Sequence, residues 1–95
     1  MKCSWDENKR QKVLNDHRVD FEKLKDIFND PFAVEYIDEE HSTDDEMRFA
    51  ILGITSAYGL TYLVYTEDIG EIHFVTARRA ENWMVTVYDE RRSRK

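Results

Sequence analysis

The sequence contains little cysteine, proline or glycine. It has one cysteine, one proline and three glycines in 95 residues. The single cysteine, Cys3, cannot form an internal disulfide, which excludes the disulfide-rich scaffolds of small secreted domains. No apolar run approaches the roughly 20 residues that a membrane helix needs, and charges begin too early for a signal peptide. We therefore expect a cytoplasmic protein that does not bind membranes.

What is present is a globular composition with polarised charge. Apolar residues make up 41% and charged residues 36%, which is too apolar for disorder and suits one domain over residues 1–95. The net charge of −6 argues against general nucleic-acid affinity. Residues 20–46 hold eleven acidic residues and two lysines, a net charge of −9, and residues 78–95 hold six basic and three acidic residues, a net charge of +3. The acidic middle is either a solvated face or a surface for a basic partner.

The N-terminal region predicts a short edge strand followed by a helix. Residues 1–5 fit the strand, and Asp6 is a suitable N-cap for a helix over residues 7–16. Apolar side chains are sparse in this helix, so it is expected to be mostly solvated.

A second helix is predicted over residues 21–29, with Asp20 as its N-cap. Its apolar side chains form one stripe at helical spacing: Phe21, Leu24, Ile27 and Phe28. Asp30 precedes the only proline and ends the helix, because a residue before proline avoids the helical conformation.

Four strands follow, rich in β-branched and aromatic residues and separated by short polar turns and an acidic loop over residues 38–46. They are expected at residues 32–37, 48–55, 60–66 and 71–77. The short connections indicate an antiparallel meander.

The segment over residues 80–91 fits either a helix or a strand. An apolar stripe at helical spacing (Ala80, Trp83, Met84, Val87 and Tyr88) favours the helix, and a frayed basic tail is expected over residues 91–95. The predicted class is therefore α+β, with two N-terminal helices and a C-terminal helix packed on one face of a mainly antiparallel four- or five-stranded sheet.

Two adjacent arginines, Arg78 and Arg79, stand at the end of the last strand. Guanidinium groups bind phosphate oxygens in a bidentate manner and do not lose their charge. Neighbouring strand residues point to opposite faces, so both arginines reach one phosphate only if the strand breaks there, and the helix from Ala80 predicts such a break. The structural alternative is an ion pair of one arginine with Glu46 or Glu67.

The chain resembles the BrnT-type toxins over about residues 4–82. The motifs that carry the resemblance are Trp5-Asp6, Lys9, His17, Val19, Phe21-Glu22, Phe28, Asp30-Pro31, Glu46 with Arg48, Gly53, Val64-Tyr65-Thr66-Glu67 and the stretch from Ile72 to Ala80.

This resemblance implies the toxin of a bacterial type II toxin–antitoxin pair, with a fold like the RelE-type ribonucleases. It implies metal-independent endoribonuclease activity on RNA, with no cofactor. It further implies a BrnA-like antitoxin that neutralises the toxin in a hetero-oligomer and through which alone the toxin reaches operator DNA.

Such cleavage uses the RNA 2′-hydroxyl as nucleophile and needs a base, cations for the charge on phosphorus and an acid. The candidate catalytic residues are Arg78, Arg79, His73, Arg48 and Glu46, and the candidate substrate ligands are Lys9 and Tyr65.

Each candidate also has a structural alternative. Arg48 is either a phosphate ligand or a member of an ion pair, and His73 is a base, an acid or structural. Glu46 is a base or, more simply, orients an arginine, and Tyr65 stacks on a base, donates a proton or packs in the core. The three histidines are expected to lie apart, His17 at the helix end, and their spacing does not suggest zinc.

A second function remains open, in which the chain is a catalytically impaired binding module that acts as antitoxin partner or corepressor. Asp16, Arg18 and His73 favour it, because the resembled toxins usually carry a basic residue, a glycine and an arginine at these positions.

Overall fold

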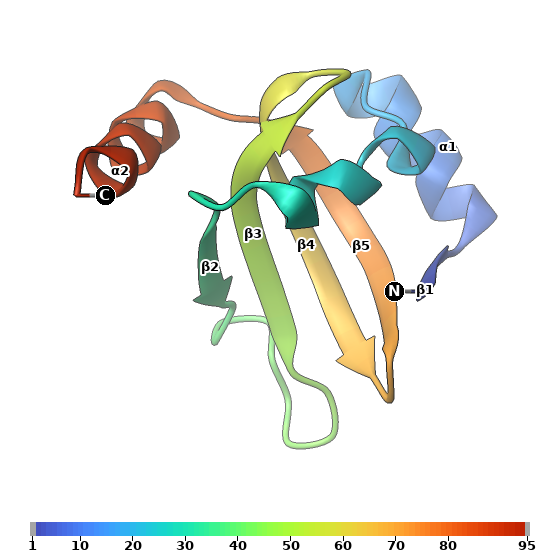
Figure 1. Ribbon diagram of the computed structural model, residues 1–95. Coiled ribbons are helices and arrows are strands. Elements are labelled where there is room, and N and C mark those ends of the chain that lie inside the picture. The colour runs from blue at the N-terminus through green and yellow to red at the C-terminus, as the bar shows by residue number, and fades with distance from the viewer. Residues whose placement is uncertain (1, 95) are drawn as a thin grey trace.

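A computed structural model describes residues 2–94 and places five strands in one sheet, in the order β1-β5-β4-β3-β2 (Figure 1). The strands are β1 Lys2–Trp5, β2 Val34–Ile37, β3 Arg48–Thr55, β4 Gly59–Asp68 and β5 Glu71–Arg79. The helical elements are α1 Glu7–His17, the 3₁₀ turns η1 Phe21–Lys23 and η2 Lys25–Asn29, and α2 Asn82–Ser93. The α+β class is confirmed. Met1, part of the predicted first strand, lies outside the described residues.

The strands β2 to β5 pair antiparallel, as the short connections predict, but β1 pairs parallel to β5. The expectation of a simple antiparallel meander is therefore incomplete. Since most of the chain separates β1 from β5, no hairpin dictates the direction of this pairing.

The first helix is capped as predicted. The Asp6 carboxylate accepts hydrogen bonds from the backbone N–H groups of Asn8 at 2.8 Å and Lys9 at 3.2 Å. The helix ends at Arg18, whose left-handed backbone has φ 59°. The Nε of Arg10 donates to Asp20 at 2.9 Å, which joins α1 to the segment that follows and lowers the pKa of the Asp20 carboxyl.

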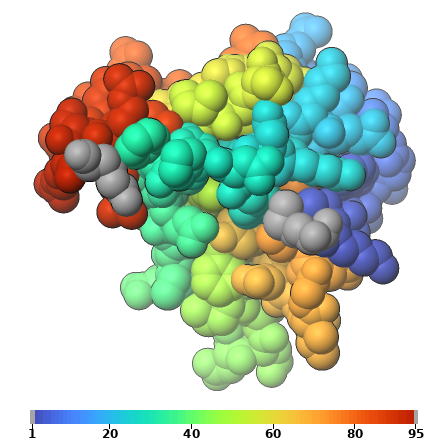
Figure 2. Space-filling model, viewed as in Figure 1, coloured from blue at the N-terminus to red at the C-terminus, as the bar shows by residue number. Residues whose placement is uncertain are grey.

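The predicted helix over residues 21–29 is wrong in type, because the segment forms the two 3₁₀ turns η1 and η2. Phe21, Leu24 and Ile27 are fully buried, and their spacing of three residues matches the three residues per turn of a 3₁₀ helix. These turns lie across one face of the sheet (Figures 1 and 2).

Beneath these turns is the main core, which includes Phe21, Ile51, Leu63 and Phe74. The approach of η2 to β3 depends on Gly53. A Cβ at this position would lie 3.0 Å from Cγ1 of Ile27 and 3.2 Å from Cβ of Ala33. The glycine therefore lets a helical turn lie directly on the strand.

The C-terminal segment is a helix, as its apolar stripe predicts, but it packs on the other face of the sheet. Met84 and Tyr88 are buried with Leu52 of β3, so the expectation that all helices cover one face is wrong. The Tyr88 hydroxyl donates to Asp30 Oδ2 at 2.6 Å. The helix continues to Ser93, so residues 91–93 are not frayed, and Lys95 lies outside the described residues.

Within residues 2–94, no helix combines the length and apolarity needed to cross a membrane.

Candidate functional site

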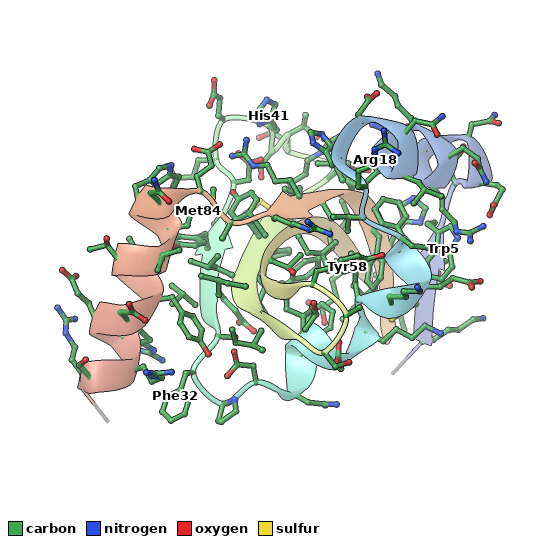
Figure 3. The ribbon with its side chains drawn as sticks, turned by 90° about the horizontal axis from the view of Figure 1, so that it is seen from above. Trp5, Arg18, Phe32, His41, Tyr58 and Met84 are labelled. Carbon is green, nitrogen blue, oxygen red and sulfur yellow. The ribbon has the colours of Figure 1, made fainter. Side chains whose placement is uncertain are left out.

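A groove with a volume of about 580 Å³ lies on the face of the sheet opposite η1 and η2. It is called the groove below. Helix α1 and the loop that bears His41 lie on the same side of the sheet when the molecule is seen from above (Figure 3). The lining side chains come from α1, the loop after β2, and strands β3, β4 and β5: Lys9, Lys12, Val13, Asp16, His17, Asp38, Glu40, His41, Arg48, Tyr62, Val64, Val75, Thr76, Ala77 and Arg78.

The floor of the groove depends on an irregularity in β5. Val64 pairs with Thr76 and Tyr65 pairs with Phe74, so Val75 is an extra residue, a β-bulge. Without it, Arg78 would share the face of Phe74, which lies in the main core. The bulge instead turns Arg78 toward the groove.

The two adjacent arginines lie on opposite faces of the sheet. Strand β5 runs through Arg79 without the break that the sequence predicts. The Arg78 guanidinium lies 5.5 Å from the ring centroid of Tyr62, in the groove, and that of Arg79 lies 5.4 Å from the ring of Tyr58. The expectation that both arginines reach one phosphate is therefore corrected, because an unbroken strand alternates its side chains.

Arg78 also forms an ion pair. Its Nη1 lies 3.0 Å from Glu81 Oε1 just before α2. Neither Glu46 nor Glu67, the partners considered from the sequence, is the residue that pairs with it. Both side chains of the pair are about half exposed, so the pair is expected to stabilise the fold little and to leave Arg78 able to bind a ligand.

Helix α1 forms a wall of the groove with a charged stripe. Lys9, Lys12, Asp16 and His17 lie at helical spacing on one face, around the buried Val13. This stripe explains why α1 has few apolar residues. Its inner face lines the groove with charged side chains instead of packing fully against the sheet. His17 and His41 both line the groove, and His73 does not.

Arg48 opens β3 at the edge of the groove. Its Nε lies 3.5 Å from Glu46 Oε1, too far for a good hydrogen bond, and is buried with no hydrogen-bond partner in the described chain. A buried guanidinium donor without a partner is costly to leave unsatisfied. Glu46 itself is exposed and does not line the groove.

The ionisable groups give the groove a mixed potential. Four basic side chains (Lys9, Lys12, Arg48 and Arg78) face three acidic ones (Asp16, Asp38 and Glu40). Burial raises the pKa of the Tyr62 phenol, as does the charge of Asp38, while Arg78 opposes the shift. The neutral Tyr62 phenol can donate a hydrogen bond on the groove floor.

Two other predicted site residues lie away from the groove. Tyr65 is 6% exposed and packs between Phe28 and Phe49 in the main core, where burial raises its pKa to about 12. His73 is exposed, with Nδ1 3.0 Å from Ser4 Oγ, and does not line the groove. The structure therefore does not support Tyr65 as a substrate ligand and separates His73 from the cations.

Sequence reasoning did not identify Lys12, Tyr62 and His41 as site residues. The spacing of Lys12 with Lys9 and Asp16 on one helix face is the signal that could have found it. Tyr62 and His41 gave no such signal, because their positions depend on strand register and loop path. In the part of the chain that the structure describes, no group of three or more His, Cys, Asp or Glu side chains is placed to hold a metal ion.

Comparison with known proteins gives a family and a fold. The sequence profile described as "Ribonuclease toxin, BrnT, of type II toxin-antitoxin system" matches residues 5–82. The 1.1 Å crystal structure of the Brucella abortus ribonuclease toxin BrnT has a TM-score of 0.68 to this chain at 23% identity, covering 86% of this chain and 99% of that one. No curated protein sequence matches.

Proposed function

We propose that the groove binds and cleaves RNA, on the premise that this chain belongs to the BrnT family of ribonuclease toxins of type II toxin–antitoxin systems. The observation that carries the proposal is the convergence of four cationic side chains from three elements on one groove of an acidic protein. Such a localised cluster suits one phosphate-bearing substrate rather than a broad nucleic-acid surface.

The cations have a defined role in this proposal. Attack of a 2′-hydroxyl on the neighbouring phosphorus places extra negative charge on the phosphate oxygens. Arg48 and Arg78 supply planar guanidinium donors for these oxygens, and both line the groove. Lys9 and Lys12 lie on the α1 wall, where they can neutralise flanking phosphates. These permanent charges can stabilise the transition state without a metal ion.

The cellular part of the proposal follows from the family. A type II toxin acts with an antitoxin, and we propose that a small BrnA-like antitoxin neutralises this chain in the cytoplasm and provides its only link to operator DNA. The acidic residues 20–46, with a net charge of −9 from eleven acidic residues and two lysines, would suit a basic segment of that partner.

Growth of cells that express the chain tests this function. Expression of the unmutated chain alone should arrest growth, and co-expression of the antitoxin from the neighbouring reading frame should restore it. A double Arg48→Ala, Arg78→Ala variant, present at equal soluble level, should permit growth. Robust growth with abundant soluble unmutated chain would contradict the proposal.

A second candidate function, a binding module with impaired catalysis, is favoured by one observation. Asp16, Asp38 and Glu40 place three carboxylates in the same groove and reduce its positive potential. In that case the purified chain would bind the antitoxin tightly and leave RNA intact at high protein concentration.

A further inference from the structure

The loop between β2 and β3 is fixed against the first residue of β3. The backbone N–H of Asp38 donates to the carbonyl oxygen of Arg48 at 2.8 Å. The Ser42 hydroxyl accepts from the N–H of Arg48 at 2.9 Å and donates to the Asp38 carbonyl oxygen at 2.6 Å. These bonds hold the loop, and His41 within it, beside the arginine that opens the strand.

Asp38 orients the imidazole of His41. The ring Nδ1 lies 3.0 Å from Oδ2 and 3.2 Å from Oδ1 of Asp38. An ionised carboxylate only accepts hydrogen bonds, so Nδ1 is the donor, and in the neutral ring the proton is absent from Nε2. The His41 side chain is 61% exposed whereas that of Asp38 is 20% exposed. Nε2 of His41 is therefore the proton-accepting nitrogen of an exposed ring, whereas the Asp38 carboxylate that orients the ring is less exposed.

The groups around His41 come from every side of the groove. Helix α1 contributes Lys9, Lys12, Asp16 and His17, strand β3 contributes Arg48 and strand β5 contributes Arg78, while Glu40 shares the loop. A phosphate held by the two arginines would therefore lie in the same cavity as the free nitrogen of His41. This arrangement of a base, its orienting carboxylate and phosphate-binding cations is the set that RNA transesterification requires.

We propose that His41 is the general base of the groove and that Asp38 is its positioning residue, an inference that rests on the proposed function. His41 Nε2 takes the proton of the 2′-hydroxyl while the O2′–P bond forms and the P–O5′ bond breaks. The leaving O5′ carries the electron pair and takes a proton from water, and the resulting hydroxide removes the proton from the imidazolium. The products are a 2′,3′-cyclic phosphate and a free 5′-hydroxyl, with no net use of water.

The other two histidines fit this role less well. His73 contacts Ser4 at 3.0 Å and lies outside the groove. His17 lines the groove, but it is the last residue of α1, and within residues 2–94 its ring has no hydrogen-bond partner that would fix its tautomer. Among the three, His41 combines access to the groove with an orienting carboxylate.

Single-turnover cleavage of a short RNA by purified His41→Gln and Asp38→Asn variants tests the inference, with His73→Gln as the matched control. His41→Gln should lower the cleavage rate by about 10²- to 10⁴-fold, with binding of a non-cleavable 2′-deoxy analogue changed by less than about twofold. Asp38→Asn should lower the rate with binding of the analogue unchanged, and the conservative Asp38→Glu should restore part of the rate, because a carboxylate can again accept from Nδ1 of His41. A merely structural role for Asp38 would not give this rescue of the rate at unchanged binding.

The possible outcomes distinguish failure of the His41 assignment from failure of the proposed ribonuclease function. Cleavage by the unmutated chain together with a His41→Gln rate within about threefold of it overturns the inference alone. Absence of cleavage by the unmutated chain overturns the proposed function and the inference together. A His73→Gln variant as slow as His41→Gln also overturns the inference, because the base would then lie outside the groove.

Discussion

At the residue scale, the backbone of Arg18 ends α1 in a conformation that is unfavourable for a residue with a Cβ. Its φ of 59° ends α1 in the left-handed conformation, which glycine adopts without the steric cost that a Cβ imposes. The side chain is exposed. Since Arg18 does not line the groove, its conformation can be relieved without altering the proposed site.

Replacement of Arg18 by glycine should therefore stabilise the fold by about 0.5–1 kcal/mol. Urea unfolding monitored by circular dichroism would measure the change in the free energy of unfolding. Asn15→Gly, at an exposed position within α1, is the control and should destabilise by up to about 1 kcal/mol. Equal destabilisation by both glycines would show that the Arg18 backbone is not strained.

At the element scale, the chain joins its parts through a few buried polar groups. Asp30 accepts from the N–H groups of Phe32 and Ile54, both at 2.9 Å, and from the Tyr88 hydroxyl at 2.6 Å. Burial alone would raise the pKa of Asp30, but these hydrogen bonds and the charge of Arg92 outweigh it, and the pKa lies below its usual value. Burial and the Asp30 carboxylate raise the pKa of Tyr88 to about 12.

Tyr88→Phe should destabilise the fold by about 1–3 kcal/mol near neutral pH, because it removes a hydrogen bond to a charged carboxylate and leaves Asp30 Oδ2 with the Ile54 N–H as its remaining donor. The folded pKa of Asp30 is lowered, so its contribution is present above its unfolded pKa near 4 and is lost as pH falls through the folded value. The folded pKa of Tyr88 is raised, so its contribution is present below about pH 10 and lost toward about pH 12. The difference between the two proteins should therefore shrink at both extremes.

Thermal unfolding across pH would measure this effect. Tyr36→Phe on β2 is the control, since in the part of the chain described here the Tyr36 hydroxyl makes no hydrogen bond. A Tyr88→Phe variant as stable as wild type at pH 7 would show that the contact does not hold α2 on the sheet.

Elements also show where sequence reasoning succeeds and fails. The Asp6 cap and the strands β3 and β4 are set by local residues, and they lie within a few residues of the predicted bounds. A stripe at positions i, i+3 and i+6 fits both the α-helical and the 3₁₀ period, so the sequence pattern does not distinguish the 3₁₀ turns from an α-helix. The bulge at Val75 gave no local signal, because it exists only in the register between β4 and β5.

At the scale of the whole molecule, charge is unevenly distributed. The net charge is −6, yet four basic side chains outnumber three acidic ones in the groove. The sequence predicted a localised site and named Arg48, Arg78 and Lys9, which the fold brings together. It also named Arg79, His73, Tyr65 and Glu46, which do not line the groove. The face that a strand side chain occupies depends on register and the position of Glu46 depends on the loop path, so neither could be predicted from local sequence.

This distribution predicts a shallow salt dependence of RNA binding. Four groove cations on single-stranded RNA should give a slope of log K against log salt of about −3, at roughly 0.7 per cation. Lys12→Ala should reduce the slope by about 0.7, and Lys23→Ala, an exposed lysine of η1 outside the groove, should leave it unchanged. Fluorescence anisotropy with a non-cleavable RNA measures both. Equal changes for the two variants would indicate diffuse binding instead of a localised site.

Strand β5 directs the adjacent residues Arg78 and Arg79 to opposite faces of the sheet. Substituting each in turn shows whether the ribonuclease site lies on the groove face. The measurement is the cleavage rate of a short RNA by purified protein in EDTA, for the unmutated chain and for Arg78→Ala and Arg79→Ala. The unmutated chain should cleave RNA without a metal ion, Arg78→Ala should reduce the rate by about 10²- to 10³-fold, and Arg79→Ala should leave it within about threefold. No cleavage by the unmutated chain, or equal loss in the two variants, would contradict a ribonuclease site on the groove face.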